Sequence, residues 1–141
     1  MSLIGLDVGT TGCKAIVVNL EGKVLGEAYR EYPLTYPQPG WAELDPDEVF
    51  DKVQVVLKEA VERAQGADPV QGIGISSQGE AGIPVDADGN FLYRSPVSFD
   101  TRAVPQTERL GERHGRERIF EITGHALNSM YTLPKIEWLI E

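Results

Sequence analysis

The residues of this chain that could do chemistry are concentrated in one stretch near its amino terminus, DVGTTGCK, from Asp7 to Lys14. Apolar runs flank the stretch on both sides, so we expect two buried strands joined by a Gly/Thr turn. Such a turn leaves backbone N–H groups and two hydroxyls free to bind an anion, with little side-chain bulk in the way. Asp7, at the end of the first strand, would supply an oxygen ligand of the kind that Mg²⁺ prefers. A phosphate-binding turn beside a metal ligand indicates nucleotide handling.

This turn differs from the two most familiar phosphate-binding motifs. The sequence has no GxxxxGK[ST] run, which a P-loop requires. A strand rather than a helix is expected after the glycines, which also excludes a Rossmann fingerprint. The alternative interpretation is an ordinary β-hairpin whose Gly and Thr residues satisfy turn geometry. The residues of the turn, taken alone, leave both interpretations open.

The composition restricts the class of protein. The 141 residues fit one domain, 1–141, and the contents of 41% hydrophobic and 25% charged residues are typical of a soluble globular protein. The net charge of −9, without a basic patch, argues against nucleic-acid binding. No signal-peptide pattern or long apolar span is present, so no membrane association is expected. The single cysteine, Cys13, cannot form an internal disulfide, which favours a cytoplasmic location, and we expect it to fill the core.

The elements that must position the turn follow from the hydrophobic pattern. Three strands joined by short turns predict an antiparallel meander. They span Leu3–Val8, Cys13–Asn19 and Val24–Tyr32. The clearest helix has Asp45 as its N-cap, Pro46 in its first turn and Glu48 at the capping-box position, and it is expected to end at Gly66. A buried strand is predicted at Val70–Ser77, and because a helix leads into it, it should run parallel to the first strand.

The remainder of the chain is predicted to be mainly helical. A polar turn at Asp86–Asn90 separates two short apolar runs and indicates a hairpin. Helices are expected at Ala103–His114, at Glu117–Ile122 and from Thr132 onward, with Thr132 as the cap of the last one. That last helix has under three turns before Glu141, too few for a stable helix without a packing partner. We therefore expect the chain to be part of a longer protein.

Several separated stretches resemble one family. They are, in chain order, DVGTTGCKAIVVNLEGKVL, PQPGWAELDPDEVF, IGISSQGEAGIPVDADGN, SFDTRA, and ITG with TLPKIEWL. Together they resemble the amino-terminal half of an FGGY carbohydrate kinase, in register along essentially the whole chain. The resemblance implies an α/β, ribonuclease H-like domain of the actin, hexokinase and sugar kinase superfamily. Its mixed sheet would begin with an antiparallel meander, continue with parallel strands and carry helices on both faces.

The resemblance also implies cofactors and roles for individual residues. In this family two domains close around ATP, Mg²⁺ and a sugar or polyol, and a substrate hydroxyl receives the γ-phosphoryl group. Asp7 would hold Mg²⁺. The residues that would face the ATP phosphates are Gly9, Thr10, Thr11, Gly12 and Lys14. Lys14 is either a charge partner of the phosphates or a solvated strand residue, because strand side chains alternate between faces.

Sugar contacts are implied at two places. Gln78 and Glu80 follow the predicted strand at Val70–Ser77, and their amide and carboxylate groups can pair with hydroxyls. Asp100 and Arg102 of the SFDTRA motif are expected to line the same cleft. The alternatives are that Asp100 caps the following helix and that Arg102 forms a structural ion pair.

The identity of the sugar stays open, because the sequence departs from each branch of the family. Gly79 stands where glycerol kinases have an arginine, and Met130 stands where they have a substrate-facing tyrosine. Xylulokinases usually have methionine and histidine at the positions of Gly79 and Glu80. The TLPK motif is more similar to the xylulokinase and gluconokinase branch.

No aspartate of this chain matches the family's catalytic aspartate. That general base, which accepts the proton of the substrate hydroxyl, is expected beyond Glu141, in the part of the protein that includes the missing carboxy-terminal ATP-binding domain. The isolated chain is therefore expected to be inactive. One alternative is a non-catalytic nucleotide-binding or interaction module of the same fold, or a truncated pseudokinase; another is a compact domain whose motifs are relics. Whether the chain forms a homo-oligomer is left open.

Overall fold

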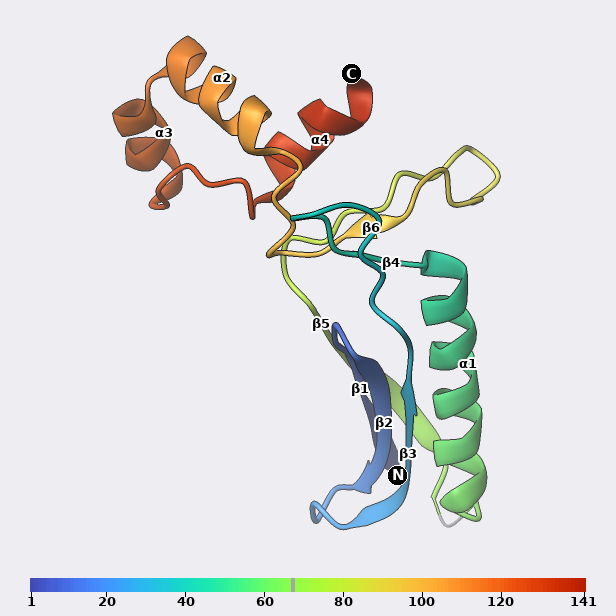
Figure 1. Cartoon of the computed structure of the whole chain (residues 1–141). Coiled ribbons are helices and arrows are strands. Elements are labelled where there is room, and N and C mark those ends of the chain that lie inside the picture. Colours follow the sequence, from blue (N-terminus) through green and yellow to red (C-terminus); the bar gives the residue numbers. More distant parts are fainter. Residues whose placement is uncertain (67) are drawn as a thin grey trace. The chain divides into compact units, whose positions relative to one another are not determined.

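The computed structural model describes residues 1–66 and 68–141, which form two compact units (Figure 1). Unit 1 comprises Met1–Leu34 and Asp45–Gln78. Unit 2 comprises Thr35–Leu44 and Gly79–Glu141. Each unit has a sheet and helical structure of its own.

An antiparallel meander opens unit 1. Its strands are β1 (Ser2–Val8), β2 (Gly12–Asn19) and β3 (Val24–Glu31). The pairing register places Asp7 of β1 opposite Lys14 of β2. Side chains of β1 alternate between the two faces, so Ile4 and Leu6 are buried while Asp7 is exposed. All three strands lie within one residue of their predicted bounds, and the predicted meander is confirmed.

A single helix, α1 (Pro46–Arg63), packs on β2 and β3 in unit 1 (Figure 1). Asp45 caps it as predicted, because its carboxylate accepts hydrogen bonds from the N–H groups of Asp47 and Glu48. The approach of the helix to β3 requires a glycine, since a Cβ at Gly26 would lie 2.3 Å from the carbonyl oxygen of Ala60. The buried apolar side chains of this unit include Ile4, Leu6, Cys13, Ala15, Val17 and Val56.

The end of α1 differs from its prediction. The C-cap is Ala64, two residues before the predicted end at Gly66. Gln65 and Gly66 that follow have left-handed φ angles of 54° and 64°, which turn the chain out of the helix.

The strand β5 (Val70–Ser77) completes the sheet of unit 1. It pairs parallel to β1, as predicted, in the strand order β3-β2-β1-β5. The prediction that this strand is buried is wrong, because it lies at the edge of the sheet and nearly all its residues are exposed. Among the described residues of unit 1, α1 is the only helix, and β1 with β5 is the only parallel strand pair. The helix α1 packs on one face of this sheet, and the other helices of the described chain belong to unit 2.

Unit 2 combines a small sheet with three helices. Two two-residue strands, β4 (Glu43–Leu44) and β6 (Ser95–Pro96), pair antiparallel. The helices are α2 (Val104–His114), α3 (Arg116–Thr123) and α4 (Thr132–Ile140), all close to their predicted positions. The predicted hairpin at Asp86–Asn90 is a turn closed by a single bridge between Val85 and Phe91. Within residues 1–66 and 68–141, every helix is too short or too polar to cross a bilayer.

Candidate functional site

The turn between β1 and β2 is held in place by its own backbone and by Tyr32. The N–H of Gly9 donates to the carbonyl oxygen of Gly12 over 2.9 Å, which closes the turn. The Tyr32 hydroxyl donates to the Gly9 carbonyl oxygen over 2.6 Å, and the Tyr32 N–H donates to the Thr11 carbonyl oxygen over 3.3 Å. Within the described ranges, the N–H groups and hydroxyls of Thr10 and Thr11 make no hydrogen bond. A fixed turn with free donors is suited to bind an anion.

Asp7 lies beside this turn on the face of the sheet opposite the buried side chains of β1. Its carboxylate is exposed, and it makes no hydrogen bond or ion pair with any described residue. No group of three or more His, Cys, Asp or Glu side chains within residues 1–66 and 68–141 could hold a metal ion by itself. A single free carboxylate nevertheless fits Mg²⁺, which keeps several waters and is usually held by one or two carboxylates together with substrate phosphates.

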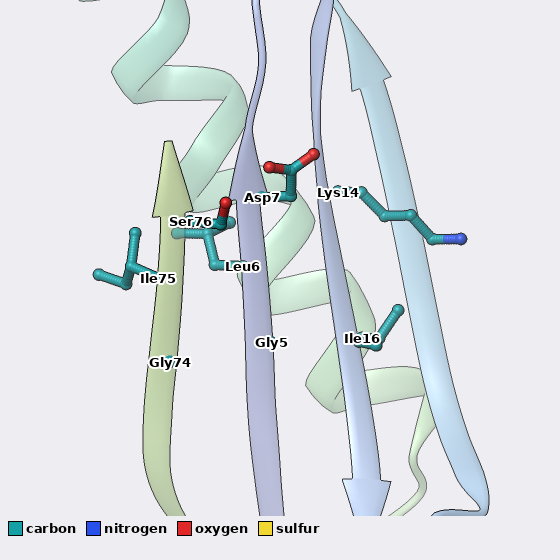
Figure 2. A pocket seen from close by; sticks show the side chains of 8 residues that line it. All are labelled: Gly5, Leu6, Asp7, Lys14, Ile16, Gly74, Ile75 and Ser76. Carbon is teal, nitrogen blue, oxygen red and sulfur yellow. The ribbon is translucent and has the colours of Figure 1, made fainter. Parts of the chain in front are cut away.

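Lys14 faces Asp7 in the strand register but is engaged elsewhere. Its ammonium lies 3.0 Å from a carboxylate oxygen of Glu27, and its side chain is 49% exposed. Figure 2 shows this side chain extending away from Asp7 and across β3. The present conformation is therefore that of a solvated strand residue in a surface ion pair, which contributes little stability. To contact a phosphate, Lys14 would have to leave Glu27.

An open hollow of about 490 Å³ lies on the sheet next to Asp7 (Figure 2). Its floor is bare backbone where Gly5 and Gly74 have no side chains. Asp7, Lys14 and Ser76 are its polar lining residues. Asp7 and Ser76 are register partners near the carboxyl ends of the parallel strands β1 and β5. Ligands of open α/β sheets bind outside the carboxyl ends of such strands. The free turn and Asp7 therefore lie where this type of sheet binds ligands.

Gln78 and Glu80, the two residues after β5 that are predicted to bind the sugar, differ in how many of their polar atoms are hydrogen-bonded within the protein. The Gln78 N–H donates to the carbonyl oxygen of Val8 over 3.0 Å and extends the ladder between β5 and β1. The side-chain Oε1 of Gln78 is buried and accepts no hydrogen bond from any described residue. Glu80 of unit 2 uses one carboxylate oxygen, Oε2, which accepts hydrogen bonds from the N–H and the hydroxyl of Thr132. Both side chains retain an acceptor for a hydroxyl.

Asp100 and Arg102 form a buried network in unit 2, with side chains fully excluded from solvent. The carboxylate of Asp100 accepts four hydrogen bonds: one from the Ala42 N–H at 2.6 Å and three from the N–H, Nε and Nη2 of Arg102 at 2.8–2.9 Å. Arg102 also donates to Glu43 over 2.7 Å. The alternative prediction that Arg102 forms a structural ion pair is confirmed. The alternative that Asp100 caps α2 is wrong, because Ala103 is the N-cap and no side chain caps that helix.

Aromatic rings complete the surroundings of Arg102. Its guanidinium carbon lies 4.0 Å from the ring centre of Trp41 and 4.9 Å from that of Trp138, which gives favourable cation–π contacts. Burial disfavours the charged guanidinium, but its hydrogen bonds to Asp100 and Glu43 outweigh this effect and raise the pKa of Arg102. The guanidinium therefore stays charged, and its contacts fix the SFDTRA loop.

Three residues with clear roles here were not predicted as site residues. Tyr32 was assigned to a strand end, where a lone tyrosine gives no sign that its hydroxyl reaches Gly9. Thr132 was predicted to cap α4, but the N-cap is Tyr131, without a side-chain cap, and Thr132 binds Glu80 instead. Lys135 is 2% exposed and donates to the carbonyl oxygen of Glu80. Thr132 and Lys135 belong to the TLPK motif, and this motif is the only feature of the sequence that could have indicated a role for them.

Comparisons with known proteins agree with this architecture. A family model described as the FGGY family of carbohydrate kinases, N-terminal domain, matches residues 2–141. The glycerol kinase of Alkalilimnicola ehrlichii is 38% identical over 143 residues, which cover 99% of this chain and 29% of that protein. The solved xylulose kinase from Rhodospirillum rubrum is 31% identical, with a TM-score of 0.93, over 99% of this chain and 29% of the other. The Plasmodium falciparum glycerol kinase with ADP is 25% identical, with a TM-score of 0.90, over 99% and 28%.

These matches bear on both the fold and the extent of the chain. The structural neighbours are sugar kinases of the actin and hexokinase type, so the predicted α/β class with a mixed sheet is confirmed. The chain spans less than a third of the length of the relatives that it matches, 28–29% in the comparisons above.

Proposed function

Since this chain belongs to the FGGY family of carbohydrate kinases as an amino-terminal domain, we propose that it is part of an ATP-dependent sugar or polyol kinase. The reaction would transfer the γ-phosphoryl group of ATP to a substrate hydroxyl. The observation that carries the proposal is the turn between β1 and β2, where Tyr32 fixes the backbone while Thr10 and Thr11 keep free donors beside the free carboxylate of Asp7. Its relatives, a glycerol kinase and a xylulose kinase, support the substrate class.

In this proposal the turn binds the nucleotide. The N–H groups and hydroxyls of the turn, from Gly9 to Gly12, would hold the ATP phosphates, and Lys14 would reach them by leaving Glu27. Asp7 would hold Mg²⁺, directly or through water. When bound, Mg²⁺ neutralises charge on the transferred group. Phosphoryl transfer depends mainly on positioning and charge neutralisation, which backbone donors and one carboxylate can provide.

The substrate side of the proposal involves four residues in two different ways. Gln78 and Glu80 would bind substrate hydroxyls directly, because each retains a side-chain acceptor. Asp100 and Arg102 would act by fixing the loop that lines the sugar site, because the Asp100 carboxylate already accepts four hydrogen bonds. A carboxylate offers about four such positions.

The rest of the machinery would lie outside this chain. We propose that the general base, an aspartate, and the second ATP-binding domain belong to the part of the protein beyond Glu141, and that the isolated chain has no kinase activity. Its partners would be the sugar or polyol and that missing domain. The single thiol, Cys13, is buried and free, which supports a reducing cytoplasmic location.

The experiment is a steady-state assay of the full-length gene product with Mg·ATP and a panel of sugars and polyols. We expect turnover with at least one member and at least about a hundredfold loss of kcat/KM in Asp7→Asn, the scale for removing one preorganised electrostatic partner. Asp51→Asn is the matched control, because Asp51 is an exposed aspartate of α1 without a hydrogen bond or ion pair in the described part of the chain.

Two results would refute the proposal. ATP binding without turnover of any sugar or polyol would favour the alternative, a non-catalytic nucleotide-binding module or pseudokinase. Equal effects of Asp7→Asn and Asp51→Asn would remove Asp7 from the nucleotide site.

A further inference from the structure

Glu80 has a backbone conformation that its side chain disfavours. Its φ angle is 62°, and Gln65 is the only other described non-glycine residue with a positive φ. The left-handed region brings Cβ close to the following carbonyl oxygen, so residues other than glycine, asparagine and aspartate seldom adopt it. Such a conformation persists when surrounding contacts hold it, and it is found preferentially at ligand sites.

The contacts that hold Glu80 come from the first turn of α4. The Lys135 ammonium donates to the main-chain carbonyl oxygen of Glu80 over 2.6 Å. The Thr132 N–H and hydroxyl donate to Glu80 Oε2 over 2.7 Å and 2.9 Å. One bond therefore fixes the backbone of Glu80, and two fix one oxygen of its carboxylate.

The position of Lys135 is unusual for a lysine. Its side chain is almost fully buried, at 2% exposure of the residue, and burial lowers its pKa, although the charges of Asp100 and Glu80 oppose this effect. In the described part of the chain, its one hydrogen-bond acceptor is the carbonyl oxygen of Glu80. Burying an ammonium to bind one carbonyl is costly unless the geometry that it fixes is needed.

The other carboxylate oxygen of Glu80, Oε1, is not used in this arrangement. Thr132 binds only Oε2, and Oε1 accepts no hydrogen bond from any residue within 1–66 and 68–141. A carboxylate with one oxygen anchored by two donors cannot rotate freely, so the direction of the other oxygen is defined.

We propose that Thr132 and Lys135 are positioning residues that lock Glu80 so that Oε1 faces a hydroxyl of the sugar or polyol. The inference rests on the proposed function, since it concerns how that substrate is bound. It assigns to the TLPK segment a role in substrate affinity, through Glu80, rather than direct contact with the substrate or with ATP.

The test uses the full-length gene product and the best substrate found in the panel. Thr132→Val removes the hydroxyl at nearly constant volume, and Thr132→Ser retains it. We expect the KM for the sugar to rise about tenfold in Thr132→Val, the scale of one charge-assisted hydrogen bond. The sugar KM should stay within about twofold of wild type in Thr132→Ser, and kcat and the KM for ATP should be nearly unchanged in both variants.

Lys135→Met tests the backbone contact, with Lys58→Met on the exposed surface of α1 as its control. We expect the first variant, and not the second, to raise the KM for the sugar. A buried lysine can be needed for folding. If Lys135→Met does not fold, the comparison of Thr132→Val with Thr132→Ser tests the proposal.

A double-mutant cycle with Glu80→Gln separates positioning from general stability. If Thr132 acts through Glu80, Thr132→Val should raise the sugar KM much less in the Glu80→Gln background than in the wild type. Equal effects in both backgrounds, or an unchanged sugar KM in Thr132→Val, would overturn the positioning role while leaving the kinase assignment intact. No turnover by the wild-type protein would instead overturn the proposed function, and the positioning role with it.

Discussion

Replacing Tyr32 by phenylalanine removes the hydroxyl that holds the turn between β1 and β2. That hydroxyl donates to the Gly9 carbonyl oxygen over 2.6 Å, and Tyr32 is only 5% exposed. A net hydrogen bond of this kind stabilises a folded protein by about 1 kcal/mol. We therefore expect Tyr32→Phe to lower the free energy of unfolding of the 141-residue chain by about 1 kcal/mol at pH 8.

Tyr32 should also make the stability of the chain depend on pH in the alkaline range. Burial, aided by the nearby Cys13, Asp7 and Tyr29, raises the pKa of Tyr32 to about 12. An unfolded tyrosine has a pKa of about 10, so between these values the folded state keeps a proton that the unfolded state has lost. Stability therefore falls as the pH rises through this window. At pH 11 the wild type should have lost about 1.4 kcal/mol through this residue. The phenylalanine variant has no such group.

The assay is urea unfolding followed by circular dichroism at pH 8 and pH 11. The unfolding free energy of wild type should exceed that of Tyr32→Phe by about 1 kcal/mol at pH 8. At pH 11 the loss of about 1.4 kcal/mol should leave the variant about 0.4 kcal/mol more stable than wild type. Tyr36→Phe is the control, because Tyr36 is 67% exposed and has no hydrogen bond in the described part of the chain. A difference that stays the same at both pH values would refute the argument, since Tyr32 would then not be a desolvated neutral donor.

Three further predictions concern the stability and association of the chain. Gly26→Ala should lower the free energy of unfolding by about 1–3 kcal/mol through its clash with α1, whereas Gly74→Ala, whose Cβ would meet nothing within 4 Å, should change it by less than about 0.5 kcal/mol. Asp100→Asn should lower the free energy of unfolding by at least about 3 kcal/mol, because Arg102 loses the charge of its buried partner. Tryptophan fluorescence during urea unfolding measures this change. Ile75 is 67% exposed on the uncharged edge strand β5, so we expect concentration-dependent self-association in analytical ultracentrifugation, which Ile75→Lys should abolish. A wild-type chain that stays monomeric at all concentrations would contradict this last expectation.

The elements of unit 1 were predictable from the sequence because their signals are local. Alternation of apolar residues marks β1 and β2, and the adjacent residues Asp45 and Pro46 mark the start of α1. The strands β4 and β6 could not be predicted in this way. Each has only two residues, and each exists because Glu43 and Leu44 meet Ser95 and Pro96 from a distant part of the sequence. Long-range pairing of this kind leaves no periodic pattern.

The candidate site shows the same division between local and long-range information. The composition of the turn after β1 predicts a phosphate-binding backbone, and no described residue accepts a hydrogen bond from the donors of Thr10 and Thr11. The sequence does not indicate which partner a polar side chain chooses. Thr132 stands where a helix cap is expected, yet its hydroxyl binds Glu80, 52 positions away. Only the structure distinguishes a cap from this tertiary contact.

Unused hydrogen-bonding capacity distinguishes candidate ligands that residue type alone treats as equivalent. The carboxylate of Asp100 accepts four hydrogen bonds, so a substrate hydroxyl could bind it only by displacing one of them. Among the described residues, none donates to Glu80 Oε1 or to the buried Oε1 of Gln78. An unpaired buried acceptor costs free energy until a donor binds it. In the full-length protein, substitutions at Gln78, and Glu80→Gln, which keeps an acceptor for Thr132, should therefore change the KM for the sugar at little cost in stability, whereas Asp100→Asn should lower stability first. The opposite pattern would mean that the buried network, not the free acceptors, binds the substrate.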